Sequence, residues 1–346
     1  MSLTGFWKSF WPVYLVALAL LWGNSYRMLV NHSASYTIDE HSYLQMAQGN
    51  FDVNVTHRYR VLLPLAAGSI TRILAGPTDL TTNGAGPSPL KASFFVINTL
   101  VLAAAGLYLF RLARAHGAAA GPALIGMAAV ITCGAAAYVT GFVLVDSAVV
   151  LMVVLLYYAL TVRSGPLLLA VTVLAPVLKE SFILFLPLVL LYGGFVPLWQ
   201  RLLALLGAAA LVAGLHAVVD ALAPPTALGS VVNALKHGNN MLSNLRWLFS
   251  ARGLFICSGV YGLFNLVLLA GFWGGKQARQ QWLAQLRLPL AGFVLAIVLV
   301  HMLLSGEMSR MLLLAAPVVS TAVALIIDRH PLFTELRRLL PTPLAN

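Results

Sequence analysis

Ten apolar runs dominate this sequence, and each is long or nearly long enough to cross about 30 Å of hydrocarbon as a helix rising about 1.5 Å per residue. So many apolar helices can be shielded from water only in a lipid bilayer. We therefore predict an all-α, polytopic membrane fold of about 10 transmembrane helices, forming a single integral-membrane domain over residues 1–346. The predicted spans cover residues 11–30, 93–110, 118–140, 146–162, 166–178, 181–198, 202–221, 253–274, 288–304 and 309–327.

The composition excludes several classes of protein. Only 9% of the residues are charged, against about 25% in an ordinary soluble domain, so a soluble enzyme and a disordered chain are both excluded. The net charge of +11 does not indicate a nucleic-acid partner, because the Lys and Arg residues flank the apolar runs. Cys133 and Cys257 lie inside apolar runs, so no disulfide framework is predicted.

One apolar stretch is too long for a single span. Residues 166–198 would form a helix of about 50 Å, and Lys179-Glu180 interrupts this stretch together with Pro176 and Pro187. A hairpin with the charged pair at its turn would fit the bilayer, and so would a pair of broken, re-entrant segments. Both arrangements place Lys179 and Glu180 at a membrane boundary.

The distribution of Lys and Arg predicts the orientation of the chain. With a cytoplasmic N-terminus, the short inner loops hold seven of these residues and the short outer turns hold two. We therefore predict cytoplasmic termini, a cytoplasmic tail at 328–346, and extracytoplasmic loops at 31–92 and 222–252. Most acids then gather at the extracytoplasmic boundary, which predicts a polar site there. These acids are Asp39, Glu40, Asp52, Asp79, Asp146, Glu180, Asp220 and Glu307.

The first outer loop contains two predicted helices. One begins at Asp39 and reaches Gly49, and the other is an amphipathic helix over 61–74 that would lie in the membrane interface. Long loops that contain such helices are often functional. Residues that could carry chemistry are therefore expected in this loop.

Asp39 and Glu40 are the candidate catalytic acids of this loop. A carboxylate at the interface could act as a general base toward an acceptor hydroxyl. The alternative is structural, because Thr37 and Glu40 match a helix capping box and Asp39 suits a first helical turn. Adjacent helical positions diverge by about 100°, so both acids cannot point into one pocket. Tyr43 lies on the Asp39 side.

Arg58 and Arg60 are candidate ligands for a phosphate. They are two residues apart, so on an extended segment both would point to one side. Two guanidinium groups on one side suit a phosphate or pyrophosphate. The alternative is a pair of arginines that reach toward lipid headgroups.

Three further candidates come from the predicted spans and their boundaries. Asp146 stands alone in an apolar stretch, where it is either a helix N-cap or a functional carboxylate with an unidentified partner. Lys179 and Glu180 are either an ion pair at a turn or ligands of a lipid headgroup.

The last candidates are a charged pair and two histidines. Glu307 and Arg310 are three residues apart on one helix face, so they either pair with each other or bind substrate. His57 and His237 are further binding candidates. The histidines lack the spacing of metal ligands, so no metal residues are predicted.

The order of these pieces resembles the bacterial integral-membrane glycosyltransferases of the GT-C superfamily. A first helix precedes a long outer loop with an acidic pair at Asp39-Glu40 and the stretch Arg58-Tyr59-Arg60-Val61-Leu62-Leu63-Pro64. An isolated Asp146, then Lys179-Glu180, and Gly306-Glu307-x-x-Arg310 before the last span follow in the same order.

The resemblance implies transfer of a sugar from a polyprenyl-phosphate carrier, usually with inversion, at the extracytoplasmic face of the bacterial inner membrane. Asp39 or Glu40 would be the catalytic acid, and Arg58, Arg60, Lys179 and Arg310 would hold the carrier phosphate. Some members need a divalent metal, so a metal cofactor is possible here. The chain carries no large C-terminal soluble domain, so a lipid-linked or small glycan acceptor is expected.

Other functions fit parts of the pattern. A polysaccharide polymerase, a ligase or a lipid-headgroup transferase would share the lipid substrate and the outer acid. A secondary transporter would place ionisable groups near the midplane, often within repeats. The acids here lie at one boundary and no repeat is visible, which disfavours transport. A catalytically inactive scaffold subunit is the remaining alternative.

Overall fold

The computed structural model describes residues 3–32, 37–75, 88–223, 241–305 and 307–340. Helices account for most of these residues, and no strand occurs among them. The α-helices are α1 (Leu3–Asn31), α2 (Ile38–Ala47), α3 (Leu62–Ala75), α4 (Pro89–Ala115), α5 (Ala120–Ile131), α6 (Gly134–Gly141), α7 (Asp146–Val162), α8 (Gly165–Leu178), α9 (Pro187–Tyr192), α10 (Leu198–Leu222), α12 (Ala251–Tyr261), α13 (Phe264–Ala270), α14 (Gly275–Leu283), α15 (Leu288–Leu304), α16 (Met308–Leu312), α17 (Ala316–Arg329) and α18 (Thr334–Leu339). The 3-10 helices are η1 (Glu180–Phe185), η2 (Leu313–Ala315) and η3 (Pro331–Phe333).

The predicted all-α class is confirmed, and several helices are apolar enough to cross a membrane. Four qualify by length and composition, or up to seven if each bent pair of helices forms one span. The bent pairs are α5–α6, α12–α13 and α14–α15, with angles of 56°, 96° and 84°. The predicted spans at 146–162, 166–178 and 181–198 correspond to shorter apolar helices. The count of about 10 spans therefore stays a prediction.

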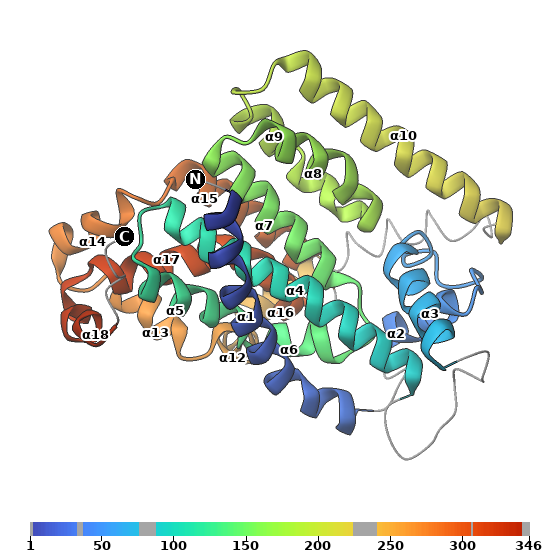
Figure 1. The fold of residues 1–346 in the computed structure, drawn as a ribbon, viewed down its shortest axis with the longest axis horizontal. Helices are drawn as coiled ribbons and strands as arrows, with labels where there is room; N and C mark the ends of the chain where they lie inside the picture. Colours follow the sequence, from blue (N-terminus) through green and yellow to red (C-terminus); the bar gives the residue numbers. More distant parts are fainter. Residues whose placement is uncertain (1–2, 33–36, 76–87, 224–240, 306, 341–346) are drawn as a thin grey trace.

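Helices α4 and α17 form the centre of the bundle. Helix α4 packs against α1, α5 and α7, and α17 packs against α5 and α4 (Figure 1). Small residues permit this close packing, because a side chain at Gly126 on α5 would collide with the backbone oxygen of Ser320 on α17. Helix α10 is different, since its main contacts in the bundle are with α8 and most of its surface is exposed.

The long apolar stretch folds back on itself at Lys179. Helix α8 ends there, and the chain continues through η1 into α9. The arms run in opposite directions, since Gly165 lies against Val196 and Gly193 lies against Leu168. A hairpin across the bilayer and a re-entrant pair both have antiparallel arms, so both arrangements left open by the sequence fit this geometry.

Two pairs of short helices lie at opposite ends of the molecule. Helices α2 and α3 occupy one end of the long axis, and α14 and α18 occupy the other (Figure 1). The loop 31–92, which contains α2 and α3, and the tail 328–346, which contains α18, were predicted on opposite sides of a membrane, and these sides stay predictions.

Helix α2 is fixed to the bundle through its cap and through a glycine. Thr37 and Glu40 form the predicted capping box, and Glu40 Oε1 also accepts a hydrogen bond of 3.1 Å from the backbone N–H of Val143. Helix α3 crosses α2 closely, because Gly68 lies directly against the backbone of Ala47. These contacts set the position of Asp39, near the start of α2.

We expect Gly68→Ala to destabilise the protein, because the added Cβ would collide with the Ala47 carbonyl oxygen. Overpacking of this kind costs about 1–3 kcal/mol, which would lower the thermal unfolding midpoint of the purified protein. Gly214→Ala on α10 is the matched control, since an added Cβ there contacts nothing. Equal midpoints for the two variants would show that α2 and α3 are not held together by this contact.

Candidate functional site

Arg310 is the centre of a charged cluster built from distant parts of the chain. Its Nη1 lies 2.7 Å from Oδ2 of Asp39 and 3.3 Å from Oε2 of Glu307, and its Nε lies 3.6 Å from Oδ2 of Asp146. The three carboxylates come from the start of α2, from the residue before α16 and from the start of α7. The structure therefore brings together four of the residues selected from sequence.

Asp39 is held on its other side by His57. The Nε2–H of His57 donates to Oδ1 of Asp39 over 2.9 Å, and Nδ1 of the same ring lies 3.1 Å from the Ser42 hydroxyl. Burial alone would raise the pKa of Asp39, but the hydrogen bond from His57 and the charge of Arg310 outweigh it. The pKa of Asp39 therefore lies below its ordinary value, and Asp39 is an anion with both oxygens engaged.

Asp146 is a buried ion-pair partner. Its Oδ1 accepts a 2.6 Å hydrogen bond from Lys179 Nζ, at the turn of the hairpin, and both side chains are 7% exposed. It is the first residue of α7, but Val145 is the N-cap and makes no side-chain cap bond. The N-cap alternative for Asp146 is therefore wrong, and its partners are Lys179 and Arg310.

Lys179 and Glu180 pair with separate partners. Glu180 Oε2 lies 3.4 Å from Nε of Arg60, whose Nη1 donates to the Tyr43 hydroxyl over 3.1 Å. Burial raises the pKa of Tyr43 to about 12 against the opposing charge of Arg60, so this hydroxyl stays neutral. A second charged group, formed by Glu180, Arg60 and Tyr43, thus adjoins the Arg310 cluster.

Arg58 does not share a surface with Arg60. Residues 55–59 form a turn, with the N–H groups of His57 and Arg58 both bonded to Asn54 O, so the predicted extended geometry is wrong. Arg58 Nε lies 3.6 Å from Asp220 on α10, and its Nε and Nη2 have no hydrogen-bond partner.

Two side chains join α10 to the turn at 55–59, a contact that was not predicted from the sequence. The Tyr59 hydroxyl donates to Asp220 over 3.0 Å, and its ring stacks on His216 at 3.6 Å between centroids. A 161-residue separation leaves no local pattern from which this contact could be found.

Glu40 has a structural place in the fold. Its Oε2 accepts from the Thr37 N–H and its Oε1 from the Val143 N–H, and the residue is fully buried. As predicted, Glu40 and Asp39 point to different sides of α2. Asp39 is the member of the acidic pair that faces the cluster.

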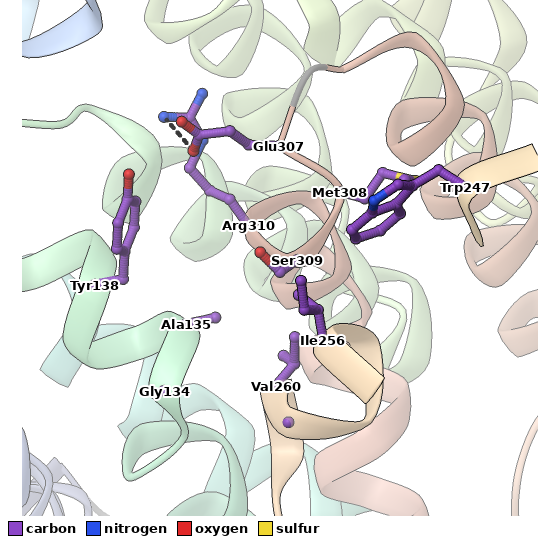
Figure 2. Close-up of a pocket in the computed structure, with 11 residues that line it drawn as sticks. Gly134, Ala135, Tyr138, Trp247, Ile256, Val260, Glu307, Met308, Ser309 and Arg310 are labelled. Atoms are coloured by element: carbon purple, nitrogen blue, oxygen red, sulfur yellow. Dashed lines mark ion pairs between the residues drawn. The ribbon is translucent and has the colours of Figure 1, made fainter. Parts of the chain in front are cut away.

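A cavity of about 420 Å³ opens beside Arg310 and Glu307. Figure 2 shows a polar wall, where Tyr138 from α6 points toward Glu307 and Arg310, and an apolar wall of Ile256, Val260, Met308 and Trp247. Sequence reasoning missed both residues, because Tyr138 is one aromatic residue in the predicted span 118–140 and Trp247 lies beside Arg246 in the predicted loop 222–252. The lining residues are Gly134, Ala135, Tyr138, Trp247, Ile256, Gly259, Val260, Glu307, Met308, Ser309 and Arg310.

Three hydrogen bonds position the cavity wall beside Glu307. Asn244 donates its side-chain amide to the backbone oxygens of Leu303 and Ser305, which ties the helical stretch at 241–248 to the end of α15. The Ser305 hydroxyl accepts from the N–H of Glu307. These bonds fix both Trp247 and Glu307 relative to the end of α15, and both residues line the same cavity.

The remaining predicted residues fall outside this cluster or outside the described structure. His237 lies outside the described residues. Within the described ranges, no group of three or more His, Cys, Asp or Glu residues is arranged to hold a metal. The carboxylates of Asp39, Asp146 and Glu307 face the guanidinium of Arg310 instead.

Comparison with known proteins adds no relative. No protein-family profile, no curated protein and no solved structure matches this chain.

We expect Asp146→Asn to be strongly destabilising, because it leaves the buried Lys179 ammonium without its carboxylate. Removing one partner of a buried pair costs about 3–5 kcal/mol. Lys179→Met should cost less, since Asp146 keeps Arg310 as a counter-charge. Thermal unfolding of both variants and of the double variant tests this order. If the double variant were no more stable than Asp146→Asn alone, the two side chains would not be coupled as described.

Proposed function

We propose that this protein is a membrane glycosyltransferase that moves a sugar from a polyprenyl-phosphate carrier to a lipid-linked or glycan acceptor. The proposal includes an extracytoplasmic site, a bacterial inner-membrane location, cytoplasmic termini and inversion at the sugar carbon. It follows the resemblance to the GT-C superfamily stated above. The geometry of the cluster supports the proposal independently of that resemblance.

The observation that carries the proposal is the two-sided cavity. A polyprenyl-phosphate sugar has a polar headgroup on an apolar chain, and the cavity has a charged wall at Arg310 and an apolar wall at Ile256 and Val260. Ligand sites of this kind combine apolar lining with a few converging polar groups. A soluble nucleotide sugar has no apolar chain that would contact the apolar wall.

The cluster contains the groups that the chemistry requires. A guanidinium stabilises the charge that develops on a departing phosphate, and Arg310 is the arginine that lines the cavity. A carboxylate takes the proton of the attacking hydroxyl, and three carboxylates surround this arginine. Arg58, Arg60 and Lys179 do not line the cavity, so we assign them to holding the carboxylates and the loop.

The positions of the acids favour this function over transport. Asp146 begins α7 and Glu180 begins η1, so both lie at the ends of helices. Transporters also use the ends of broken helices near the bilayer centre, so measured accessibility that placed Asp146 or Glu180 at the bilayer centre would favour transport instead.

The test is release of polyprenyl phosphate by the purified protein in lipid nanodiscs. The donors are polyprenyl-phosphate glucose, mannose and galactose, with ethyl glycosides as hydroxyl acceptors. We expect one donor to be consumed, and Asp39→Asn to lose turnover by about 100-fold or more without loss of folded protein. Asp52→Asn is the matched control, because Asp52 is exposed in the same loop. No turnover of any donor by the wild-type protein, or transfer of the phosphate with the sugar, would overturn the proposal.

We expect Arg310→Lys to weaken donor binding while preserving the fold. Lysine keeps the positive charge among the three carboxylates but cannot present the planar fork of N–H donors that suits a phosphate. The KM for the consumed donor should rise by more than kcat falls. An unchanged KM in a folded variant would remove Arg310 from the phosphate site.

A further inference from the structure

We propose that Glu307 is the residue that takes the proton from the acceptor hydroxyl, and that Asp39 and Asp146 position Arg310. This inference rests on the proposed function and specifies which of the three carboxylates acts in it.

The three carboxylates differ in their access to the cavity. Glu307 lines it with a side chain that is 39% exposed, whereas Asp39 is 18% exposed and Asp146 is 7% exposed, and neither lines the cavity. An acceptor hydroxyl in the cavity could come within hydrogen-bonding distance of Glu307 without any displacement of the ion pairs. A proton acceptor must meet this geometric condition first.

The three carboxylates also differ in the number of partners that occupy them. Asp39 has one oxygen on His57 and the other on Arg310, and Asp146 has one on Lys179 and the other facing Arg310. Glu307 contacts Arg310 through Oε2 at 3.3 Å, and the Tyr138 hydroxyl points toward it. Figure 2 shows Tyr138 and Arg310 approaching Glu307 from the polar wall.

The charges that face Glu307 make it the better base. Burial raises its pKa, the carboxylates of Asp39 and Asp146 raise it further, and Arg310 and the Tyr138 hydroxyl oppose them. The net pKa of Glu307 is above its ordinary value, whereas that of Asp39 is below. A carboxylate with a raised pKa accepts a proton more readily near neutral pH.

The proposed reaction is a displacement at the anomeric carbon of the sugar. The acceptor oxygen attacks the anomeric carbon of the sugar, and the bond from that carbon to the phosphate oxygen breaks. The leaving polyprenyl phosphate keeps the electron pair, beside Arg310. The acceptor proton moves to the Glu307 carboxylate, and water later removes it.

Azide tests this assignment, because it attacks the sugar without having a proton to lose. We expect Glu307→Gln to lose transfer to ethyl glycosides by about 100-fold or more and to retain formation of glycosyl azide from the consumed donor. Asp39→Asn should lose both reactions, since it disturbs Arg310. Glu335→Gln, an exposed glutamate on α18, is the matched control and should lose neither.

The outcomes separate this inference from the proposed function. If the wild-type protein consumes no donor, the proposed function fails. Two outcomes would overturn only the inference, because in each the proton goes to another carboxylate. In the first, the wild type consumes donor and Glu307→Gln transfers normally to hydroxyls. In the second, azide restores Asp39→Asn and not Glu307→Gln. Binding of polyprenyl phosphate by Glu307→Gln, measured by thermal stabilisation, should match the wild type and confirm an intact site.

The pH dependence of activity is a second measurement. A purely structural role for Asp39 would leave this pH dependence unchanged. Protonated Glu307 cannot accept a proton, so wild-type activity should fall on the acid side, at a pH above the ordinary glutamate value of about 4.3. The Asp39 carboxylate raises the pKa of Glu307, so the residual activity of Asp39→Asn should show this limb at lower pH. An unchanged limb would overturn the positioning role of Asp39.

Discussion

One guanidinium group holds the charged end of this molecule together. Arg310 contacts Asp39, Asp146 and Glu307, and it joins the start of α2 to the start of α7 and to the residue before α16. Three carboxylates this close would repel one another strongly in a partly buried site without a cation between them. Lys179 contacts the other oxygen of Asp146, and His57 contacts the other oxygen of Asp39. The position of every candidate catalytic group therefore depends on this arginine.

The fold brings these charges together by placing each of them at a helix boundary. Asp39 is in the first turn of α2, Asp146 begins α7, and Lys179 lies at the turn of the hairpin. The apolar bodies of the helices meet in the bundle, so charges at their ends can meet on one side without crossing the apolar interior. The same arrangement leaves a cavity with one charged and one apolar wall. A lipid-linked substrate would match both walls at once.

The sequence predicted much of the local structure and little of its assembly. The capping box at Thr37 and Glu40 and the amphipathic helix after Arg60 follow from short-range patterns, and both are present. The Asp39–Arg310 pair joins residues 271 positions apart, and no local pattern encodes such a contact. The error at Arg58 and Arg60 has a simple physical reason, since Asn54 initiates a turn through its side chain and its backbone oxygen. Tyr138 was missed because hydropathy treats every apolar run alike, and Trp247 was missed because the segment 222–252 was interpreted as a loop.

A carrier lipid bound beside Arg310 is the central claim of this account, and native mass spectrometry of the protein purified in mild detergent tests it most directly. The measurement identifies by mass any lipid that remains on the protein. We predict a polyprenyl phosphate, with or without a sugar, at one copy per chain, and its loss in Arg310→Lys. A wild-type protein that carries only bulk phospholipids, and that gains no polyprenyl phosphate when this lipid is added, would contradict the account.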